Sequence, residues 1–368
     1  MKSKKIGYLN GVIFIPEIPG IHKDYEFLMK VNQNELKLFN KDLVLVYTKN
    51  FEKNINSVQL LEKNKTNIFL VGVNNKIYYL DKCLNIKEEF SPDFEIKKVL
   101  SVWNNEEKTY NFIVQSDRSI YCYSSIMAKL WRYPINEDFD EEILSLSLTN
   151  NQFNIPIIFG NTKNEVFLVG LNGGEIIKKN FYEVFSVHPL SEGIVVYCYE
   201  PDASDEKKYV LKMIRFDDPK KENLNILYAS NKPFNAVTSG SIQSDKPYMI
   251  FFQEGAEFMA INQNGTKYLE NLIVLNFQVK KIIIEELDNM AFHCKFPDSR
   301  QHQENVSELA LLCENEIIFC VPKLFVENSA IKMRFIEIDK HQIDGLDGFF
   351  IPERQNRFPK RAFYGVSD

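Results

Sequence analysis

The chain has 368 residues, of which 45% are hydrophobic and 26% are charged, so it can bury a large core. Its net charge of −6 at pH 7 argues against a nucleic-acid-binding protein, which usually carries a basic surplus. The first apolar stretch is interrupted by Asn10, Gly11 and Pro16, unlike a signal peptide, and no apolar run has the ~20 residues of a membrane-spanning helix. We therefore expect a cytoplasmic protein without a membrane partner.

Seven segments share one pattern, in which an apolar run, a short polar turn and a second apolar run follow one another. In chain order, the turns lie at Asn32–Asn34, Asn74–Asn75, Asp117–Arg118, Lys163–Asn164, Ser204–Asp205, Gly255 and Glu314–Asn315. Each pattern predicts a β-hairpin. The first run of each pair is almost continuously apolar, which is typical of a strand that is covered on both faces.

Further strands are predicted on both sides of these hairpins. The segments expected to form inner strands precede a hairpin and comprise residues 97–103, 141–148 and 235–240. The segments expected to form outer strands follow a hairpin and comprise residues 83–90, 128–135, 174–180 and 266–272. The dipeptides Asn172-Gly173 and Asn264-Gly265 are suited to the tight turns between strands. Each repeat is therefore expected to contain four antiparallel strands.

The repeat recurs at roughly 40–60 residues, and four strands at such a period are typical of a β-propeller. We predict that residues 1–338 form an all-β, seven-bladed propeller with four-stranded antiparallel blades. A strand from residues 1–24 or from residues 331–338 is expected to close the ring by pairing with a blade from the other end. Packed β-sandwiches, a solenoid and a mixed α/β fold are the alternatives, although no long stretch has a helical period.

Two segments carry the details of such a blade. VFLVGLNGGEIIKK (residues 166–179) and EFMAINQNGTKYLEN (residues 257–271) each contain an apolar strand, an Asn/Gly turn and a closing strand. Over about residues 20–325 the chain resembles the β-propeller superfamily, in particular WD-repeat and quinoprotein-like propellers. It lacks the Trp-Asp and Gly-His dipeptides of true WD repeats. The resemblance concerns the fold, which does not by itself imply a function.

Residues 339–368 differ from the rest and are predicted to be an irregular C-terminal extension. Here basic and aromatic residues are interleaved, and Pro352 and Pro359 interrupt regular structure. Exposed aromatic and arginine side chains anchor protein interfaces. The candidate partner-binding residues are Phe349, Phe350, Arg354, Arg357, Phe358, Arg361, Phe363 and Tyr364. The alternatives are that the extension packs on its own propeller or stays unattached.

No pattern of catalytic or ligand-binding residues is present. The six cysteines form no CxxC pair and lie mostly in apolar runs, so reduced, buried thiols are expected. The five histidines lack metal-ligand spacing, and the acidic residues at 138–142 and 285–288 are interpreted as solvated loops. Trp103 and Trp131 are expected to pack inside a blade. We therefore predict no catalytic residue, no cofactor and no metal.

These observations favour a non-enzymatic protein–protein interaction scaffold within a larger assembly. Its partners are expected to be proteins, contacted through the C-terminal extension, and not nucleic acids. One alternative is a structural component of a phage tail, which would place the chain in a virion. Another is a propeller enzyme of the glycosidase or quinoprotein type, which would need two carboxylates about 5–10 Å apart on its inner strands.

Overall fold

The fold of this chain was analysed in a computed structural model. The residues it describes are 4–5, 9–14, 27–31, 34–39, 45–63, 66–104, 109–135, 141–150, 155–201, 207–240, 248–267, 278–285, 308–313, 316–327, 330–342 and 350–351. All regular elements in these ranges are β-strands. The chain divides into two compact units, Met1–Ile143 with Asp344–Asp368, and Leu144–Ile343.

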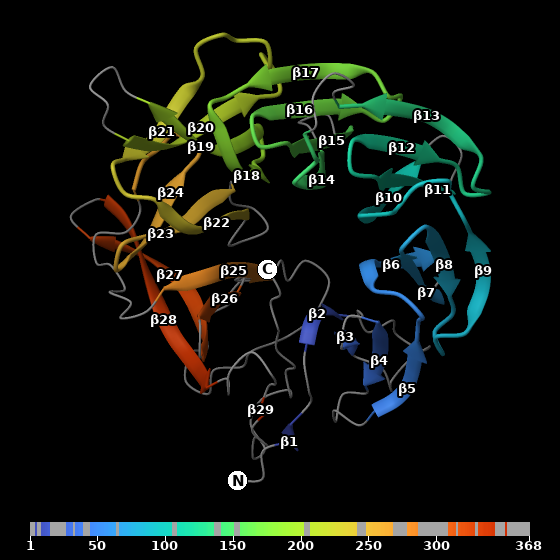
Figure 1. The fold of residues 1–368 in the computed structure, drawn as a ribbon. Helices are drawn as coiled ribbons and strands as arrows, with labels where there is room; N and C mark the ends of the chain where they lie inside the picture. The colour runs from blue at the N-terminus through green and yellow to red at the C-terminus, as the bar shows by residue number, and fades with distance from the viewer. Residues whose placement is uncertain are drawn as a thin grey trace. The chain divides into compact units, whose positions relative to one another are not determined.

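The first unit contains three four-stranded antiparallel sheets, in which the strands pair in chain order (Figure 1). The first sheet comprises β2 (Leu9–Phe14), β3 (Phe27–Val31), β4 (Glu35–Phe39) and β5 (Leu45–Asn50). The second comprises β6 (Ile55–Lys63), β7 (Thr66–Val73), β8 (Lys76–Leu80) and β9 (Ile86–Phe90). The third comprises β10 (Lys98–Asn104), β11 (Thr109–Gln115), β12 (Ser119–Tyr123) and β13 (Lys129–Pro134).

The second unit contains four sheets with the same order of strands. The first comprises β14 (Ser145–Asn150), β15 (Pro156–Asn161), β16 (Glu165–Gly170) and β17 (Glu175–Asn180). The second comprises β18 (Glu183–Pro189), β19 (Gly193–Pro201), β20 (Lys207–Arg215) and β21 (Asn225–Ser230). The third comprises β22 (Phe234–Gly240), β23 (Met249–Glu254) and β24 (Glu257–Asn262). The fourth comprises β25 (Val279–Glu285), β26 (Glu308–Cys313), β27 (Glu316–Glu327) and β28 (Ala330–Gln342).

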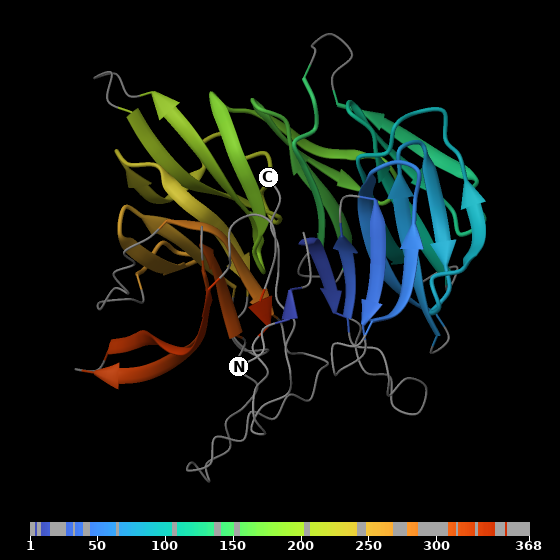
Figure 2. The same ribbon diagram turned by 60° about the horizontal axis from the view of Figure 1, so that its bottom comes forward.

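The seven predicted hairpins are all confirmed, because each predicted turn lies between the second and third strand of a sheet. The backbone explains the residues found at several turns. Asn74 has a φ of 52°, while Gly173, Gly255 and Gly265 have φ values of 80°, 59° and 80°. Glycine and asparagine tolerate this left-handed region better than other residues. The antiparallel strands of each sheet can be followed in the second view (Figure 2).

Successive sheets within each unit pack face to face. In the first unit, Leu70 and Ile77 of the second sheet lie in one buried cluster with Val99 and Phe112 of the third. In the second unit, Phe159 of the sheet β14–β17 lies in one cluster with Val196 of the next sheet. Middle strands are buried on both faces, so adjacent side chains that point in opposite directions are both enclosed. This explains the nearly continuous apolar runs of the sequence.

Several expectations about the ends of the repeats are corrected. Within the described residues, neither β2 of the segment 1–24 nor β28, which contains residues 331–338, joins a sheet from the other end, since β2 pairs with β3 and β28 pairs with β27. Pairing between chain neighbours needs only a short loop, which limits its entropic cost. Instead, the two-residue strands β1 (Lys4–Lys5) and β29 (Phe350–Ile351) pair with each other, so the C-terminal extension is not irregular throughout.

The boundary of the last repeat and the sixth set of strands also differ from the prediction. Strand β28 continues to Gln342, beyond the predicted boundary at residue 338. The sheet β22–β24 has three strands among the described residues. Its predicted outer strand, residues 266–272, is described only as far as Lys267, which forms an isolated bridge with Ile261.

Gly160 provides a test of this packing. A Cβ atom at this position of β15 would lie 2.2 Å from the backbone oxygen of Ser145 and 2.6 Å from the Phe167 ring. We expect Gly160→Ala to lower the free energy of unfolding by about 1–3 kcal/mol, because the closely packed sheet must shift. Urea denaturation measures this change. Gly174→Ala is the control, since there the nearest atom belongs to the side chain of Asn172, and equal losses for both variants would contradict the packing argument.

Candidate interaction site

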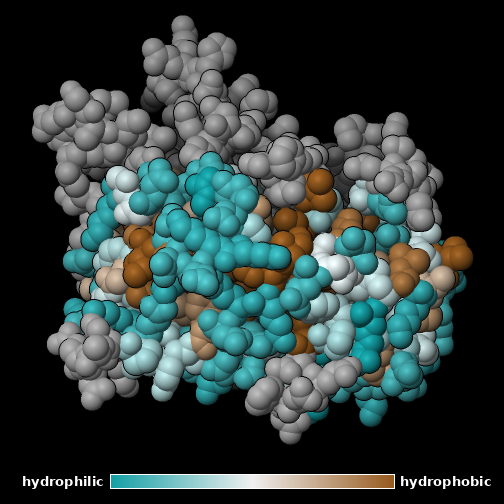
Figure 3. Space-filling view, turned by 90° about the horizontal axis from the view of Figure 1, so that it is seen from above, coloured by the Kyte–Doolittle hydropathy of each residue, from teal (hydrophilic) through white to brown (hydrophobic). Residues whose placement is uncertain are grey.

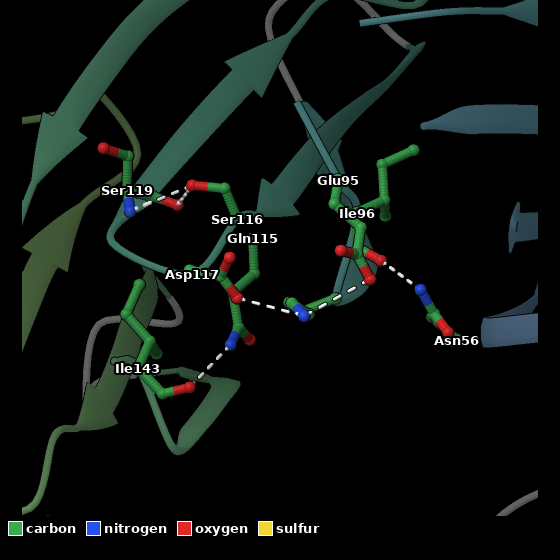
Figure 4. A network of polar contacts seen from close by, with 9 residues as sticks. Asn56, Glu95, Ile96, Gln115, Ser116, Asp117, Ser119 and Ile143 are labelled. Atoms are coloured by element: carbon green, nitrogen blue, oxygen red, sulfur yellow. Dashed lines mark hydrogen bonds and ion pairs between the residues drawn. The ribbon is translucent and has the colours of Figure 1, made fainter. Parts of the chain in front are cut away.

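Hairpin turns of the first unit are held against the segment that leads to the next sheet, and Figure 4 shows part of this network around Ile96, Asp117 and Ile143. The Ile96 N–H donates to the Asn74 oxygen at 2.6 Å, and the Asn56 amide donates to the Ile96 oxygen at 2.6 Å. In the next sheet, the Ile143 N–H donates to the Asp117 oxygen at 2.8 Å. These bonds satisfy backbone groups and fix the position of the turns.

Buried glutamines strengthen these links. Gln115 ends β11, is 5% exposed and donates from Nε2 to the Ile143 oxygen at 2.9 Å. In the second unit, Gln253 of β23 is 1% exposed and accepts a bond from the Val279 N–H at 2.6 Å. The amide side chains therefore join one sheet to the segment that follows it, and unpaired they would be costly to bury.

An ion pair lies on the solvent side of the same network. Lys97 Nζ lies 3.1 Å from Asp117 Oδ1 and 3.3 Å from Glu95 Oε1. The hydrogen bond to Asp117 raises the pKa of Lys97 above its usual value. These side chains are well exposed, so the pair adds little to stability.

The hairpin between β15 and β16 is held in the same way in the second unit. The Phe181 N–H donates to the Asn164 oxygen at 2.7 Å, and the Val184 N–H donates to the Lys163 oxygen at 2.6 Å. The Asn164 side chain also donates to the Tyr182 oxygen. These contacts fix the start of β18 and, with it, the aromatic side chains that flank this point.

Four aromatic residues form a patch that we call the aromatic shelf: Tyr182, Phe185, Tyr199 and Tyr209. The ring centroids of Tyr182 and Tyr199 are 5.3 Å apart, and those of Tyr199 and Tyr209 are 5.9 Å apart. The Phe185 ring lies 5.9 Å from Tyr209. Tyr182 is 62% exposed and Phe185 is 42% exposed. Exposed rings that already contact each other offer a preordered surface to a partner.

The lengths of the strands explain why the shelf is uncovered. Strands β19 and β20 have 9 residues each, whereas β23 and β24 of the following sheet have 6. Tyr197 lies two residues before Tyr199, and its ring is 5.2 Å from Phe234 of β22. Its hydroxyl also accepts a 2.9 Å bond from the Phe234 N–H. The following sheet thus covers Tyr197 and leaves the longer end of the β19–β20 hairpin exposed.

Two carboxylates lie beside the shelf. Glu183 is the register partner of Tyr199, and its nearest described cation is Lys163 Nζ at 3.9 Å. Glu254 accepts a 2.5 Å hydrogen bond from the Tyr228 hydroxyl and a second bond from Ser230. Burial and the bond to Glu254 raise the pKa of Tyr228. Both carboxylates add negative charge to a surface made mainly of rings.

One histidine of the same sheet is held by protein. The Nε2 atom of His188 in β18 and the Ser186 hydroxyl share a hydrogen bond of 2.9 Å, and burial lowers the pKa of His188 to about 4. A neutral imidazole beside a serine hydroxyl is also found in catalytic dyads. No metal-binding group of three or more His, Cys, Asp or Glu side chains occurs among the residues that the structure describes.

The structure places only part of the residues singled out in the sequence. Phe350 of β29 pairs with Lys5 of β1. The other seven candidate residues of the extension lie outside the described ranges. The acidic residues Asp138 and Asp140 lie outside them as well. Glu141 and Glu142 are half-buried and exposed, respectively. In the described part of the chain, no helix is long and apolar enough to cross a membrane.

The expectations for cysteine and tryptophan have mixed outcomes. Cys122 and Cys198 are buried free thiols, as predicted, and burial raises the pKa of each to about 12, while Cys83 is half-buried. Trp131 is half-buried in β13. Trp103 is 41% exposed and contacts Tyr110 edge-on, so its predicted packing inside a sheet is only partial.

The aromatic shelf was not predicted from the sequence. Its signal is present, because Tyr197 and Tyr199 alternate along β19 and Tyr209 faces Tyr199 on the next strand. Alternation shows that such residues share a face, but only the length of the following sheet decides which of them stay exposed. On the face drawn in Figure 3, hydrophobic residues also lie between hydrophilic ones, so single exposed apolar residues are not distinctive.

The sequence matches no family model and no curated protein. Among solved structures, BBS1N in complex with ARL6DN is similar with a TM-score of 0.52 and 9% identity, over 90% of this chain and 97% of that one. The Cps50 (Swd1) β-propeller domain of Myceliophteria thermophila has a TM-score of 0.50 and 10% identity, over 91% of this chain and 99% of that one. The fold is a β-propeller. Each sheet is therefore a blade, and a closed ring of seven stays a prediction.

The bond made by Gln115 gives a stability prediction. Gln115→Leu removes the donor to the Ile143 oxygen, and we expect a loss of about 1–3 kcal/mol in the free energy of unfolding. Chemical denaturation measures the loss. Asn56→Ala removes a similar bond from an exposed side chain and should cost less, because water replaces it. A larger loss for Asn56→Ala would refute the role given to buried Gln115.

His188 gives a pH prediction. Its pKa of about 4 lies below the ordinary value of 6.5, so the unfolded chain binds more protons between these pH values. The free energy of unfolding should therefore fall as the pH drops from 6.5 towards 4. Urea titrations of the unmodified chain and of His188→Gln at several pH values measure this slope. The variant should lose less stability over this window, and identical slopes would show that His188 is not responsible.

Proposed function

We propose that this chain is a non-enzymatic protein–protein interaction scaffold that works within a larger assembly. The observation that carries the proposal is the aromatic shelf, where the neighbouring rings of Tyr182 and Phe185 are 62% and 42% exposed. Aromatic side chains supply much of the binding energy in protein interfaces. One structural relative, BBS1N, was crystallised in complex with ARL6DN, which is an example of a similar fold in a protein complex.

The rigid surroundings of the shelf support this role. The hydrogen bonds from Phe181 and Val184 to the β15–β16 turn fix the segment that carries Tyr182 and Phe185. A partner that binds rings already held in place loses little side-chain entropy on binding. The shelf thus has both the chemistry and the order of an interface anchor.

The part of the C-terminal extension that follows β28, residues 343–368, is proposed as a second element of the scaffold beside the propeller. Its interleaved arginine and aromatic residues are suited to docking on a protein partner. We further propose that the chain acts in the cytoplasm, without a nucleic-acid or membrane partner. The net charge of −6 supports the exclusion of nucleic acid.

Cross-linking of the tagged chain in its native cells, followed by mass spectrometry, tests the proposal. We expect cross-links between a protein partner and peptides that contain shelf residues. Tyr182→Ser combined with Phe185→Ser should reduce recovery of this partner by about tenfold or more. Ile226→Ser is the matched control, because Ile226 is 57% exposed on β21 of the same blade. Its register partner is Lys212, and both lie on the face of the sheet opposite to Tyr209.

The two variants separate the possible results. Loss of the partner with the shelf variant alone supports the proposal. Equal recovery with all chains, or no cross-linked partner at all, contradicts the shelf as an interaction site.

A further inference from the structure

We propose that the aromatic shelf binds residues 353–364 of a second copy of this chain, so that the scaffold joins to itself. The inference rests on the proposed function and deepens it, because it names the occupant of the shelf. It also gives a partner to the C-terminal extension. The argument depends on three matching properties of the two surfaces.

The first property is charge. Residues 353–364 read ERQNRFPKRAFY and contain Arg354, Arg357, Lys360 and Arg361 against the single acid Glu353. The shelf is flanked by Glu183, whose carboxylate lies 3.9 Å from Lys163 Nζ, and by Glu254, which accepts hydrogen bonds from the Tyr228 and Ser230 hydroxyls. Opposite charges on two surfaces favour their encounter and fix the orientation of the complex.

The second property is the affinity of cations for aromatic faces. Guanidinium groups stack on tyrosine and phenylalanine rings when the ring face is accessible. This chain already makes cation–π contacts, since Lys267 Nζ lies 4.9 Å from the Tyr228 ring and Arg132 Cζ lies 6.0 Å from the Tyr121 ring. The exposed rings of Tyr182 and Phe185 offer the same contact to an arginine from outside.

The third property is the match in ring content. The segment contains Phe358, Phe363 and Tyr364, which can pack against the rings of the shelf. Pro359 favours an extended backbone in the residue before it, and extended segments that contain proline dock on aromatic surfaces. Two rings of the shelf, Tyr182 and Phe185, are 62% and 42% exposed, while Tyr199 and Tyr209 are half-buried beside the shorter strands β23 and β24.

A complementation experiment with the full chain tests the proposal. The shelf variant carries Tyr182→Ser and Phe185→Ser, and the segment variant carries Arg354→Glu, Arg357→Glu and Arg361→Glu. Size-exclusion chromatography with light scattering over a range of concentrations should show that the unmodified chain self-associates. Each variant alone should associate at least about tenfold more weakly. An equimolar mixture should form heterodimers, because one variant keeps an intact segment and the other an intact shelf.

Two controls make the result specific. Ile226→Ser should associate like the unmodified chain, and circular dichroism with thermal unfolding should show that all variants are folded. Rising salt should weaken the association, since part of it is electrostatic. A fluorescent peptide of residues 353–364 should bind the segment variant but not the double variant that also lacks the shelf rings.

Several results would overturn the inference. These are an unmodified chain that stays monomeric, variants that associate normally, a mixture that does not recover association, and cross-links that join segment and shelf only within one chain. If self-association is absent while a different protein still needs Tyr182 and Phe185, the scaffold proposal stands and this inference fails.

Discussion

The packing of sheet against sheet, with the middle strands buried on both faces, is the constraint on which the rest of this structure depends. Ile113 and Val114 are neighbours in β11, point in opposite directions and are both fully buried. Such a strand needs an apolar residue at nearly every position, and burial of this kind is the main source of stability. It also explains why Cys122 and Cys198 serve as small apolar side chains with a raised thiol pKa.

The same constraint determines where polar residues are found. The backbone groups at the end of such a strand need hydrogen-bond partners. In this chain, the backbone of the turns and the amide side chains provide them. Gln115 and Gln253 occupy corresponding places at the ends of β11 and β23, where each binds the backbone of a segment that comes later. Hydrogen bonds at these ends hold the blades in register, so the residues exposed on the surface have fixed positions.

A difference in strand length turns this regular pattern into a specific surface. Strands β19 and β20 are longer than β23 and β24, and the rings of Tyr199 and Tyr209 near their ends are half-buried, whereas the Tyr197 ring is buried against Phe234. Beside them, Tyr182 and Phe185 are 62% and 42% exposed, and Glu183 is the register partner of Tyr199. Propeller folds carry many functions, and local departures from the repeat of this kind decide which function a given chain has.

The sequence by itself determined the class of fold and the position of all seven hairpins, because paired apolar runs and Asn/Gly turns are local signals with a direct physical cause. It also indicated that the chain lacks a familiar catalytic motif. Only the tertiary structure decided that β2 and β28 pair with their chain neighbours, that Trp103 is partly exposed, and that Tyr182 and Phe185 stay exposed beside two half-buried tyrosine rings. These features depend on the lengths of strands that are distant in sequence. The alternation of residues along one strand does not indicate how far the neighbouring strand extends.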